Sequence, residues 1–267
     1  KADARSKTHG KRTPCPSMLW RRGAKAAALY GAALVGLSPA SCEKARRLAV
    51  TAAAPDASHA CPTSTINLIL GPYADPAVEV PCEIIWNWLQ VLFSPRLNVA
   101  RVSRAWDKAS VALRGAGRWI KARGPMSAVI CVLMDMQWRP CAYNEWVDHE
   151  GFRWVCCLEP GQVLNTHTAA PLLASVRARL VDIQWGMAEK RRLGTGLAKN
   201  HDLTCAKRHL EYWRRRGMHG HAAMLEKIVL GALWPEARRH DAKMPGSWEK
   251  CGLCTSGEPQ REAHVAF

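Results

Sequence analysis

The chain has 267 residues, of which 48% are hydrophobic and 22% charged, and 38 Lys and Arg outnumber 22 Asp and Glu to give a formal net charge of +16. This composition excludes a fully disordered chain, a collagen-like chain and a coiled coil, and the length allows one large or two modest domains. So large a positive charge predicts a polyanionic partner. Because the chain begins at Lys1 rather than Met and Phe267 ends it inside the metal motif described below, we expect a fragment.

The eleven cysteines are odd in number, widely spread and mostly embedded in apolar runs. This pattern predicts reduced thiols in an intracellular compartment. A cleaved secretory leader is the alternative, because basic residues 11–25 precede the apolar run Ala26–Leu37 and the small residues 38–41. The basic arm is too long for a leader, and the twelve apolar residues are too few to span a bilayer, which takes about 20. We therefore expect no membrane partner.

The predicted elements begin after a disordered basic arm at residues 1–16. Two helices are expected within residues 18–54, and the second follows Ser38, which can cap it, with Pro39 at the first helical position. Asp75, which precedes a proline, is the next start signal. The residues after it form an apolar stripe at helical spacing.

A long helix is predicted from Pro95 to about Arg123, before Gly124 and Pro125 stop it. Residues 126–137 are hydrophobic on every side, which predicts a helix at the centre of the core. Alternating residues at 146–155, about a turn at Glu150-Gly151, predict the one β-hairpin. Three further helices are predicted at 171–192, 203–216 and 221–233, and the buried face of the first is expected to carry Leu172, Leu173, Val176, Leu180, Ile183 and Met187.

The positive charge is concentrated in three segments. Lys and Arg outnumber Asp and Glu by 11 to 2 at residues 1–50, by 8 to 1 at 96–123 and by 11 to 4 at 177–216. If these segments share one side of the molecule, they form a positive surface that binds RNA and/or DNA through the phosphate backbone. The candidate nucleic-acid-binding residues are Arg101, Arg104, Lys108, Arg114, Arg118, Lys121, Arg214, Arg215 and Arg216.

A plainer interpretation is that each basic segment is only the solvated face of an amphipathic helix, in a helical scaffold without a ligand. Trp106, Trp119 and Trp213 lie inside the basic segments. They either stack on unpaired bases or anchor their helices in the core. The sequence leaves both interpretations open.

A metal motif lies near the end of the chain, where Cys251-Gly252-Leu253-Cys254 precedes His264. Two thiolates on a tight turn and an imidazole beyond them suit a tetrahedral zinc ion, although a fourth ligand is missing. A second candidate set, His201, Cys205 and His209, has helical spacing but no obvious fourth group.

No catalytic residues are predicted. Tyr73-Ala74-Asp75 resembles the motif at which polymerases hold two magnesium ions, but it lacks an adjacent carboxylate, and Asp75 before Pro76 is better explained as a helix cap. The chain also lacks a phosphate-binding loop, a dinucleotide fingerprint and a nucleophile motif. We therefore expect neither an enzyme nor a small-molecule substrate, and a small enzyme with a cleaved leader is the least favoured alternative.

Several segments, taken in order, resemble the region that follows the polymerase domain in non-LTR (LINE-type) retrotransposon reverse transcriptases. The first is the run AAALYGAALVGL at residues 26–37. The others are GPMSA at 124–128, WRP at 138–140, the hairpin at 146–154, RRGMHG at 215–220, GALW at 231–234 and the terminal Cys-Cys-His motif.

This resemblance implies a domain order of thumb-like and linker-like helices at 17–123, a helical domain at 124–246 with a hairpin near 144–156, and a truncated zinc knuckle at 247–267. The family's last zinc ligand would follow Phe267, so zinc binding here would be weak or absent. The region would hold template RNA or target DNA in the nucleus, while the catalytic aspartates of the parent RNA-directed DNA polymerase lie elsewhere. The missing Cys and the missing polymerase core also fit a decayed copy. The sequence therefore predicts a mostly α-helical, multi-helix array with one β-hairpin and a truncated C-terminal zinc knuckle.

Overall fold

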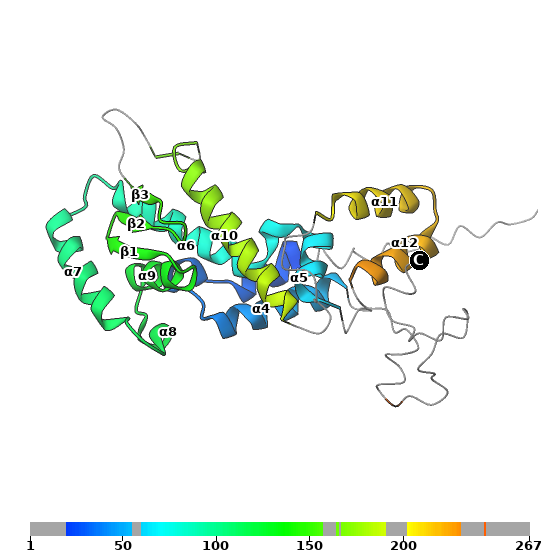
Figure 1. The fold of residues 1–267 in the computed structure, drawn as a ribbon, viewed down its shortest axis with the longest axis horizontal. Coiled ribbons are helices and arrows are strands. Elements are labelled where there is room, and N and C mark those ends of the chain that lie inside the picture. Colours follow the sequence, from blue (N-terminus) through cyan, green and yellow to red (C-terminus); the bar gives the residue numbers. More distant parts are fainter. Residues whose placement is uncertain are drawn as a thin grey trace, which may run out of the picture.

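The computed structural model describes residues 20–54, 60–156, 164–165, 167–190, 202–230 and 243. This part of the chain is mostly helical with one small antiparallel sheet, which confirms the predicted class (Figure 1). The predicted arm at 1–16 and the knuckle at 247–267 lie outside it.

The label η marks short π or 3-10 helices, α marks α-helices and β marks strands. In chain order the elements are η1 (Trp20–Ala24), α2 (Lys25–Ala28), α3 (Ala32–Val35), α4 (Pro39–Ala53), α5 (Pro62–Thr65), η2 (Ile66–Leu70), η3 (Pro72–Ala74), α6 (Pro76–Leu92), α7 (Val99–Ala112), α8 (Arg118–Lys121), α9 (Pro125–Asp135), β1 (Arg139–Ala142), β2 (Glu145–Val147), β3 (Arg153–Val155), α10 (Ala170–Glu189), α11 (Thr204–Arg215) and α12 (His219–Val229).

Two predicted helix starts are confirmed by their caps. The Ser38 hydroxyl accepts a hydrogen bond from Ser41 N at 3.2 Å, and α4 begins at the following residue. The Asp75 carboxylate accepts one from Ala77 N at 2.9 Å at the start of α6. Both side chains satisfy backbone N–H groups that a helix N-terminus leaves without partners.

Glycines divide two segments that were predicted to be continuous helices. The first helix expected within residues 18–54 is replaced by η1, α2 and α3, with Gly31 and Gly36 at positive φ (+72° and +78°). The helix expected from Pro95 to Arg123 is likewise two helices, α7 and α8, because Gly115 and Gly117 between them have φ values of +91° and +72°. Glycine takes this left-handed conformation at low cost, whereas a helix requires negative φ.

The main core is centred on α9, as predicted. Residues 128–133 on α9 are almost entirely inaccessible to solvent. They belong to one cluster that includes Trp88 of α6, Trp106 of α7 and Trp185 of α10. One core therefore contains residues from both sides of the predicted domain boundary at 123/124.

The sheet contains the predicted hairpin and one more strand. In the predicted hairpin β2 and β3 pair antiparallel, with Trp146 opposite Trp154, and Gly151 in the turn has φ +91°. The additional strand β1 pairs with β2 through an irregular register next to Pro140.

The Asp148 carboxylate lies in the β2–β3 turn and accepts hydrogen bonds from the N–H groups of Phe152, Trp154 and Glu150. Burial favours a higher pKa for this carboxyl, but the three hydrogen bonds outweigh burial and lower the pKa.

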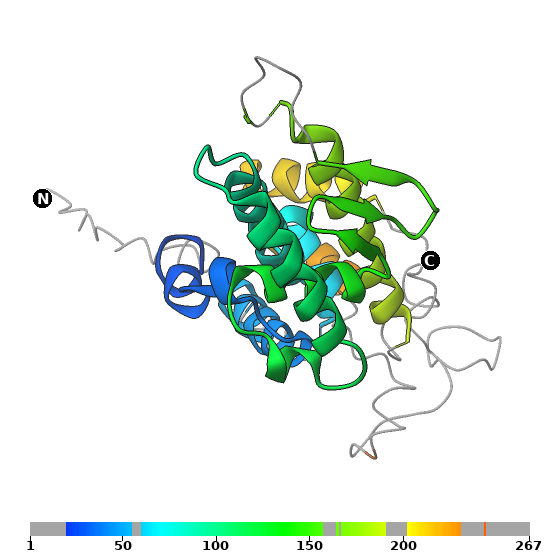
Figure 2. The same ribbon diagram turned by 90° about the vertical axis from the view of Figure 1, so that its left-hand side faces the viewer.

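The molecule is elongated, with α7 near one end and α11 and α12 towards the other (Figure 1). Leu210 of α11 and Ala222 of α12 belong to a second cluster with Ala54, Ala60 and Leu68. Turned by 90°, the molecule presents α7 towards the viewer (Figure 2). None of the described helices is long and apolar enough to cross a membrane.

Candidate functional site

The helix α7 buries Trp106 on the side opposite its cations. The Asn98 carboxamide caps it by accepting a hydrogen bond from Arg101 N at 3.0 Å. Trp106 is 1% exposed and packs against Trp88 with ring centroids 5.6 Å apart. Because this face is fixed in the core, the opposite face presents Arg101, Arg104 and Lys108 to solvent.

Further exposed cations lie before α7, between α7 and α8, and as far as Arg123. We call the set the α7–α8 surface, and its members are exposed: Arg96, Arg101, Arg104, Lys108, Arg114, Lys121 and Arg123. The only acidic residue within 96–123 is the exposed Asp107. Residues 96–123 therefore carry seven exposed cations and one exposed acid, and α7 lies near one end of the molecule (Figure 1).

Carboxylates do not neutralise the cations of the α7–α8 surface: within the described ranges, none of the seven forms an ion pair. Two of the seven side chains form hydrogen bonds that the structure shows, and both donate to backbone carbonyl oxygens. Arg104 Nε donates to Ala100 O at 3.3 Å, and Lys121 Nζ donates to Ala112 O at 3.4 Å. Exposed cations without acidic partners produce a positive potential that attracts polyanions.

Arg118, also a predicted site residue, has a structural role instead. Its Nε and one terminal nitrogen donate to Asp135 Oδ1 at 3.1 and 2.7 Å. The other oxygen of Asp135 accepts a hydrogen bond from Trp119 Nε1 at 2.8 Å. One carboxylate thus ties two consecutive residues of α8 to the end of α9.

The remaining predicted residues lie on or next to α11, which Figure 1 places towards the opposite end of the molecule from α7. Arg214 forms an ion pair with Glu226, and Arg215 lies 3.5 Å from a Glu211 oxygen. The Arg216 guanidinium lies over the Tyr212 ring, 4.6 Å from its centroid. The nine predicted residues therefore form two separate groups, and local partners engage each arginine of the second group.

The three tryptophans of the basic segments act as anchors. Trp106 is buried, Trp119 is held by Asp135, and the half-buried Trp213 packs against the second cluster. The interpretation in which they anchor their helices is the one that these contacts support.

The predicted zinc ligands Cys251, Cys254 and His264 lie outside the described residues. His201 of the second candidate set also lies outside them, while Cys205 and His209 are exposed on α11. Among the described residues, no group of three or more His, Cys, Asp or Glu side chains is arranged to hold a metal ion.

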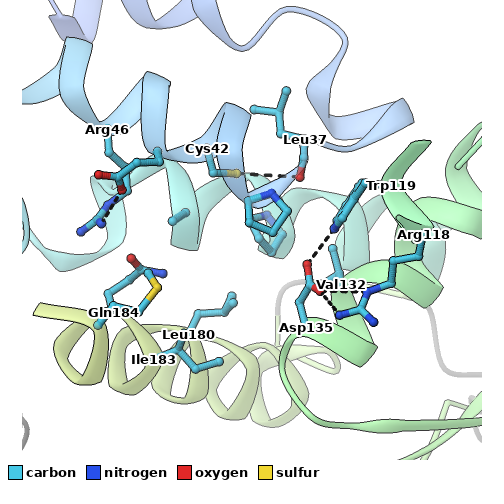
Figure 3. Close-up of a pocket in the computed structure, with 15 residues that line it drawn as sticks. Leu37, Cys42, Arg46, Arg118, Trp119, Val132, Asp135, Leu180, Ile183 and Gln184 are labelled. Atoms are coloured by element: carbon cyan, nitrogen blue, oxygen red, sulfur yellow. Dashed lines mark hydrogen bonds and ion pairs between the residues drawn. The ribbon is translucent and has the colours of Figure 1, made fainter. Parts of the chain in front are cut away.

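A central cavity of about 260 Å³ lies between α4, α6, α8, α9 and α10 (Figure 3). Most of its wall is apolar, from Leu37 and Pro39 at one side to Leu180 and Ile183 of α10. Met187, which is 40% exposed, is one of its lining residues. The sequence predicted Ile183 and Met187 on the buried face of α10, but the first is half-buried and the second exposed, and both line this cavity.

Charged groups border the cavity at two places, and each has partners. At one, the buried Arg46 donates from Nε to both oxygens of Asp75 at 2.9 and 3.0 Å, and from a terminal nitrogen to Thr63 Oγ1 at 2.8 Å. At the other is Asp135, with its two α8 partners. Burial raises the pKa of the Cys42 thiol in the cavity wall to about 12, so this cysteine is a neutral thiol at physiological pH.

Sequence reasoning missed the residues that shape this cavity. Arg46 pairs with Glu43 on its own helix, but its pairing with Asp75 and that of Asp135 with Arg118 arise from the tertiary fold, which no local pattern reveals. Gln184 had a signal, since it follows Val176 and Leu180 at spacings of four on the apolar stripe of α10. A polar residue on such a stripe indicates a buried polar group.

Comparison of the chain with known proteins gives no match, either to a protein-family model, to a curated protein or to a solved structure. The functional argument therefore rests on the residues and geometry described above.

Proposed function

We propose that this chain binds the phosphate backbone of RNA or DNA through the α7–α8 surface and does not itself catalyse a reaction. The observation that carries the proposal is the set of seven exposed cations without carboxylate partners among the described residues. Binding through phosphates releases condensed counterions and carries little sequence information, so affinity should depend strongly on salt and weakly on sequence.

The cellular context of this binding is proposed from the order of the sequence motifs. The run at residues 26–37 and the motifs from residue 124 onwards support a fragment of a retroelement reverse transcriptase downstream of its polymerase domain. In that context the α7–α8 surface would hold template RNA or target DNA while another part of the parent protein performs synthesis. A terminal zinc knuckle, completed by a ligand beyond Phe267, belongs to the same proposal.

The test is fluorescence anisotropy with a labelled single-stranded oligonucleotide, as RNA and as DNA. With seven contacts, affinity should fall about a thousandfold between about 50 and about 200 mM salt. The triple variant R101E/R104E/K108E should bind at least about tenfold more weakly than the wild type at low salt and show a shallower salt dependence. The control, R208E/R215E/R216E on and beside α11, changes the net charge equally and should have a much smaller effect.

Two results would contradict the proposal. Affinity that barely changes with salt would exclude a phosphate-binding surface. Equal losses from the two triple variants would show that net charge, rather than the α7–α8 surface, determines binding. An absence of saturable binding at low micromolar protein would instead favour the helical scaffold without a ligand.

A further inference from the structure

The exposed face of α7 alternates cations with small side chains. One stripe along the helix, at spacings of four, three and four residues, consists of Arg101, Ala105, Lys108 and Ala112. All four are exposed, and the exposed Arg104 lies one turn before Lys108. The two alanines add little bulk beside the cations, so a partner can approach the backbone of α7 closely.

The other side of α7 is fixed, because Trp106 belongs to the main core, and Figure 1 shows the helix at the outer edge of the molecule. The helix has 14 residues and is therefore about 21 Å long. Exposed cations lie beyond both of its ends, Arg96 before it and Arg114 and Lys121 after it. Lys121 donates to Ala112 O at 3.4 Å, which places it next to the last residue of α7.

The major groove of B-form DNA suits a helix of this kind. The groove is about 12 Å wide, and an α-helix with its side chains is about 10–12 Å across. Small residues at 105 and 112 allow the helix to approach the base edges, where Arg and Lys donate to guanine O6 and N7. The cations beyond the ends of α7 would then contact the phosphates that border the groove. The major groove of an RNA duplex is deep and narrow and does not admit side chains, so DNA fits better.

The one acid of this region, Asp107, favours base edges over a surface of phosphates alone. It is exposed next to Lys108 and forms no ion pair among the described residues. Phosphates repel a carboxylate, whereas in the major groove a carboxylate can accept a hydrogen bond from the amino group of cytosine. An acid among the cations is therefore compatible with a helix that faces bases.

We propose that α7 enters the major groove of double-stranded DNA, with Arg101, Arg104 and Lys108 at the base edges and the cations beyond its ends on the phosphates. This inference rests on the proposed function and deepens it, because it names B-form DNA as the partner. The base contacts add a modest preference for guanine to an affinity that the phosphates otherwise determine. An RNA duplex would contact the phosphate-binding cations alone.

Three DNA duplexes of one sequence, which differ at the guanine positions, test for groove entry. 7-Deazaguanine lacks the N7 acceptor in the major groove, whereas inosine lacks the amino group in the minor groove, and neither changes the phosphate charge. In anisotropy titrations with the full chain, the 7-deazaguanine duplex should bind about fivefold more weakly than the guanine duplex, as expected for one base contact, and the inosine duplex about equally. An RNA duplex of the same sequence should also bind at least about fivefold more weakly.

The variant Ala105→Leu adds bulk to the stripe and leaves the charge unchanged. It should bind the guanine DNA duplex at least about fivefold more weakly than the wild type does, because the base contacts are lost, and the RNA duplex equally. The matched control Ala174→Leu makes the same exchange at an exposed position of α10 and should bind every probe as the wild type does.

The proposal is overturned if the wild type binds the guanine and 7-deazaguanine duplexes with equal affinity, or if Ala105→Leu binds DNA as tightly as the wild type. If binding nevertheless stays strongly dependent on salt, only phosphates are contacted and the proposed function stands. An absence of binding to every probe overturns both. Because the wild-type comparison needs no variant, it decides the matter even if Ala105→Leu folds poorly.

Discussion

At the scale of single residues, the dominant feature is the buried pair formed by Arg46 and Asp75. Their side chains are 2% and 1% exposed, and the guanidinium Nε contacts both carboxylate oxygens. Asp75 also caps α6, and Thr63, which accepts from Arg46, lies 3.4 Å from the carbonyl oxygen of Gln184. The pair therefore links α4, the start of α6, α5 and α10 around one end of the central cavity.

Replacing Arg46 should test how much the fold depends on this pair. Arg46→Met leaves the Asp75 carboxylate buried without its cation, and we expect the free energy of unfolding to fall by about 3–5 kcal/mol. The matched control is Arg47→Met, because Arg47 is 74% exposed on the same helix, its one ion pair among the described residues is with Glu43, and its replacement should change stability by less than about 1 kcal/mol. Urea denaturation followed by circular dichroism measures both. Similar losses from the two variants would contradict a special role for the buried pair.

Residue-scale predictions from the sequence succeeded where the determining contact is local. Ser38 and Asp75 were identified as caps because their partners lie two or three residues away. Asp75 also illustrates the limit, since its cap was predicted but its pairing with Arg46, 29 residues earlier, was not. The buried side-chain oxygen of Gln184, which has no hydrogen-bond partner in the described part of the chain, depends in the same way on the tertiary fold.

At the scale of elements, glycines with positive φ interrupt two segments that the sequence predicted as continuous helices. The connection between α3 and α4 is the clearest case, because Gly36 combines φ +78° with direct packing against Trp119. A Cβ atom built at Gly36 would lie 2.3 Å from Trp119 Cζ3 and 3.2 Å from Ala128 Cβ. The apolar run at residues 26–37 predicted a helix, but no sequence pattern indicated that the Trp119 ring on α8 would occupy this space.

A comparison of two glycines separates backbone strain from this close packing. Gly31→Ala should cost about 1–2 kcal/mol, because φ is +72° but, apart from its chain neighbours, no atom of the described residues lies within 4 Å of the new Cβ. Gly36→Ala adds a steric clash with Trp119 to the same strain, and we expect a total of about 3–5 kcal/mol. Thermal or urea denaturation gives both values. Equal costs would mean that Trp119 moves away without penalty.

The sheet shows why short strands are hard to predict. The β2–β3 hairpin was found from its alternation and its Glu150-Gly151 turn, whereas β1 contains Pro140 and pairs through an irregular register. A proline within a short run argues against a strand, because it cannot donate a ladder hydrogen bond. Only the neighbouring strand β2 makes the assignment of β1 clear.

At the scale of the whole molecule, the sequence order of the segments did not predict how they are arranged in space. The predicted α7–α8 and α11 cations do not meet, since their helices lie towards opposite ends (Figure 1). The main core, by contrast, joins α6 and α7 to α9 and α10 across the predicted boundary at 123/124. The periodicity of each helix predicted which face is buried, but not which helices bury their faces together.

Dividing the chain at this boundary should therefore disrupt both parts. We expect fragments 1–123 and 124–267, expressed separately, to lack a cooperative thermal transition, because each exposes core residues such as Trp88 or Ile130. The intact chain, measured by the same calorimetric scan, is the control. A sharp transition in either fragment would show that the core is divisible and that the boundary separates independent domains.

The helix α8 has only four residues, too few to be stable without tertiary contacts, and Asp135 holds two of them. Its Trp119 forms part of the cavity wall, while Lys121 faces outward on the cationic side. If binding inside the cavity changed the affinity of the α7–α8 surface for a polyanion, thermodynamic reciprocity would require the polyanion to change the affinity inside the cavity by the same factor. Asp135 thus holds in place a short helix that carries both a ring in the cavity wall and an outward-facing cation.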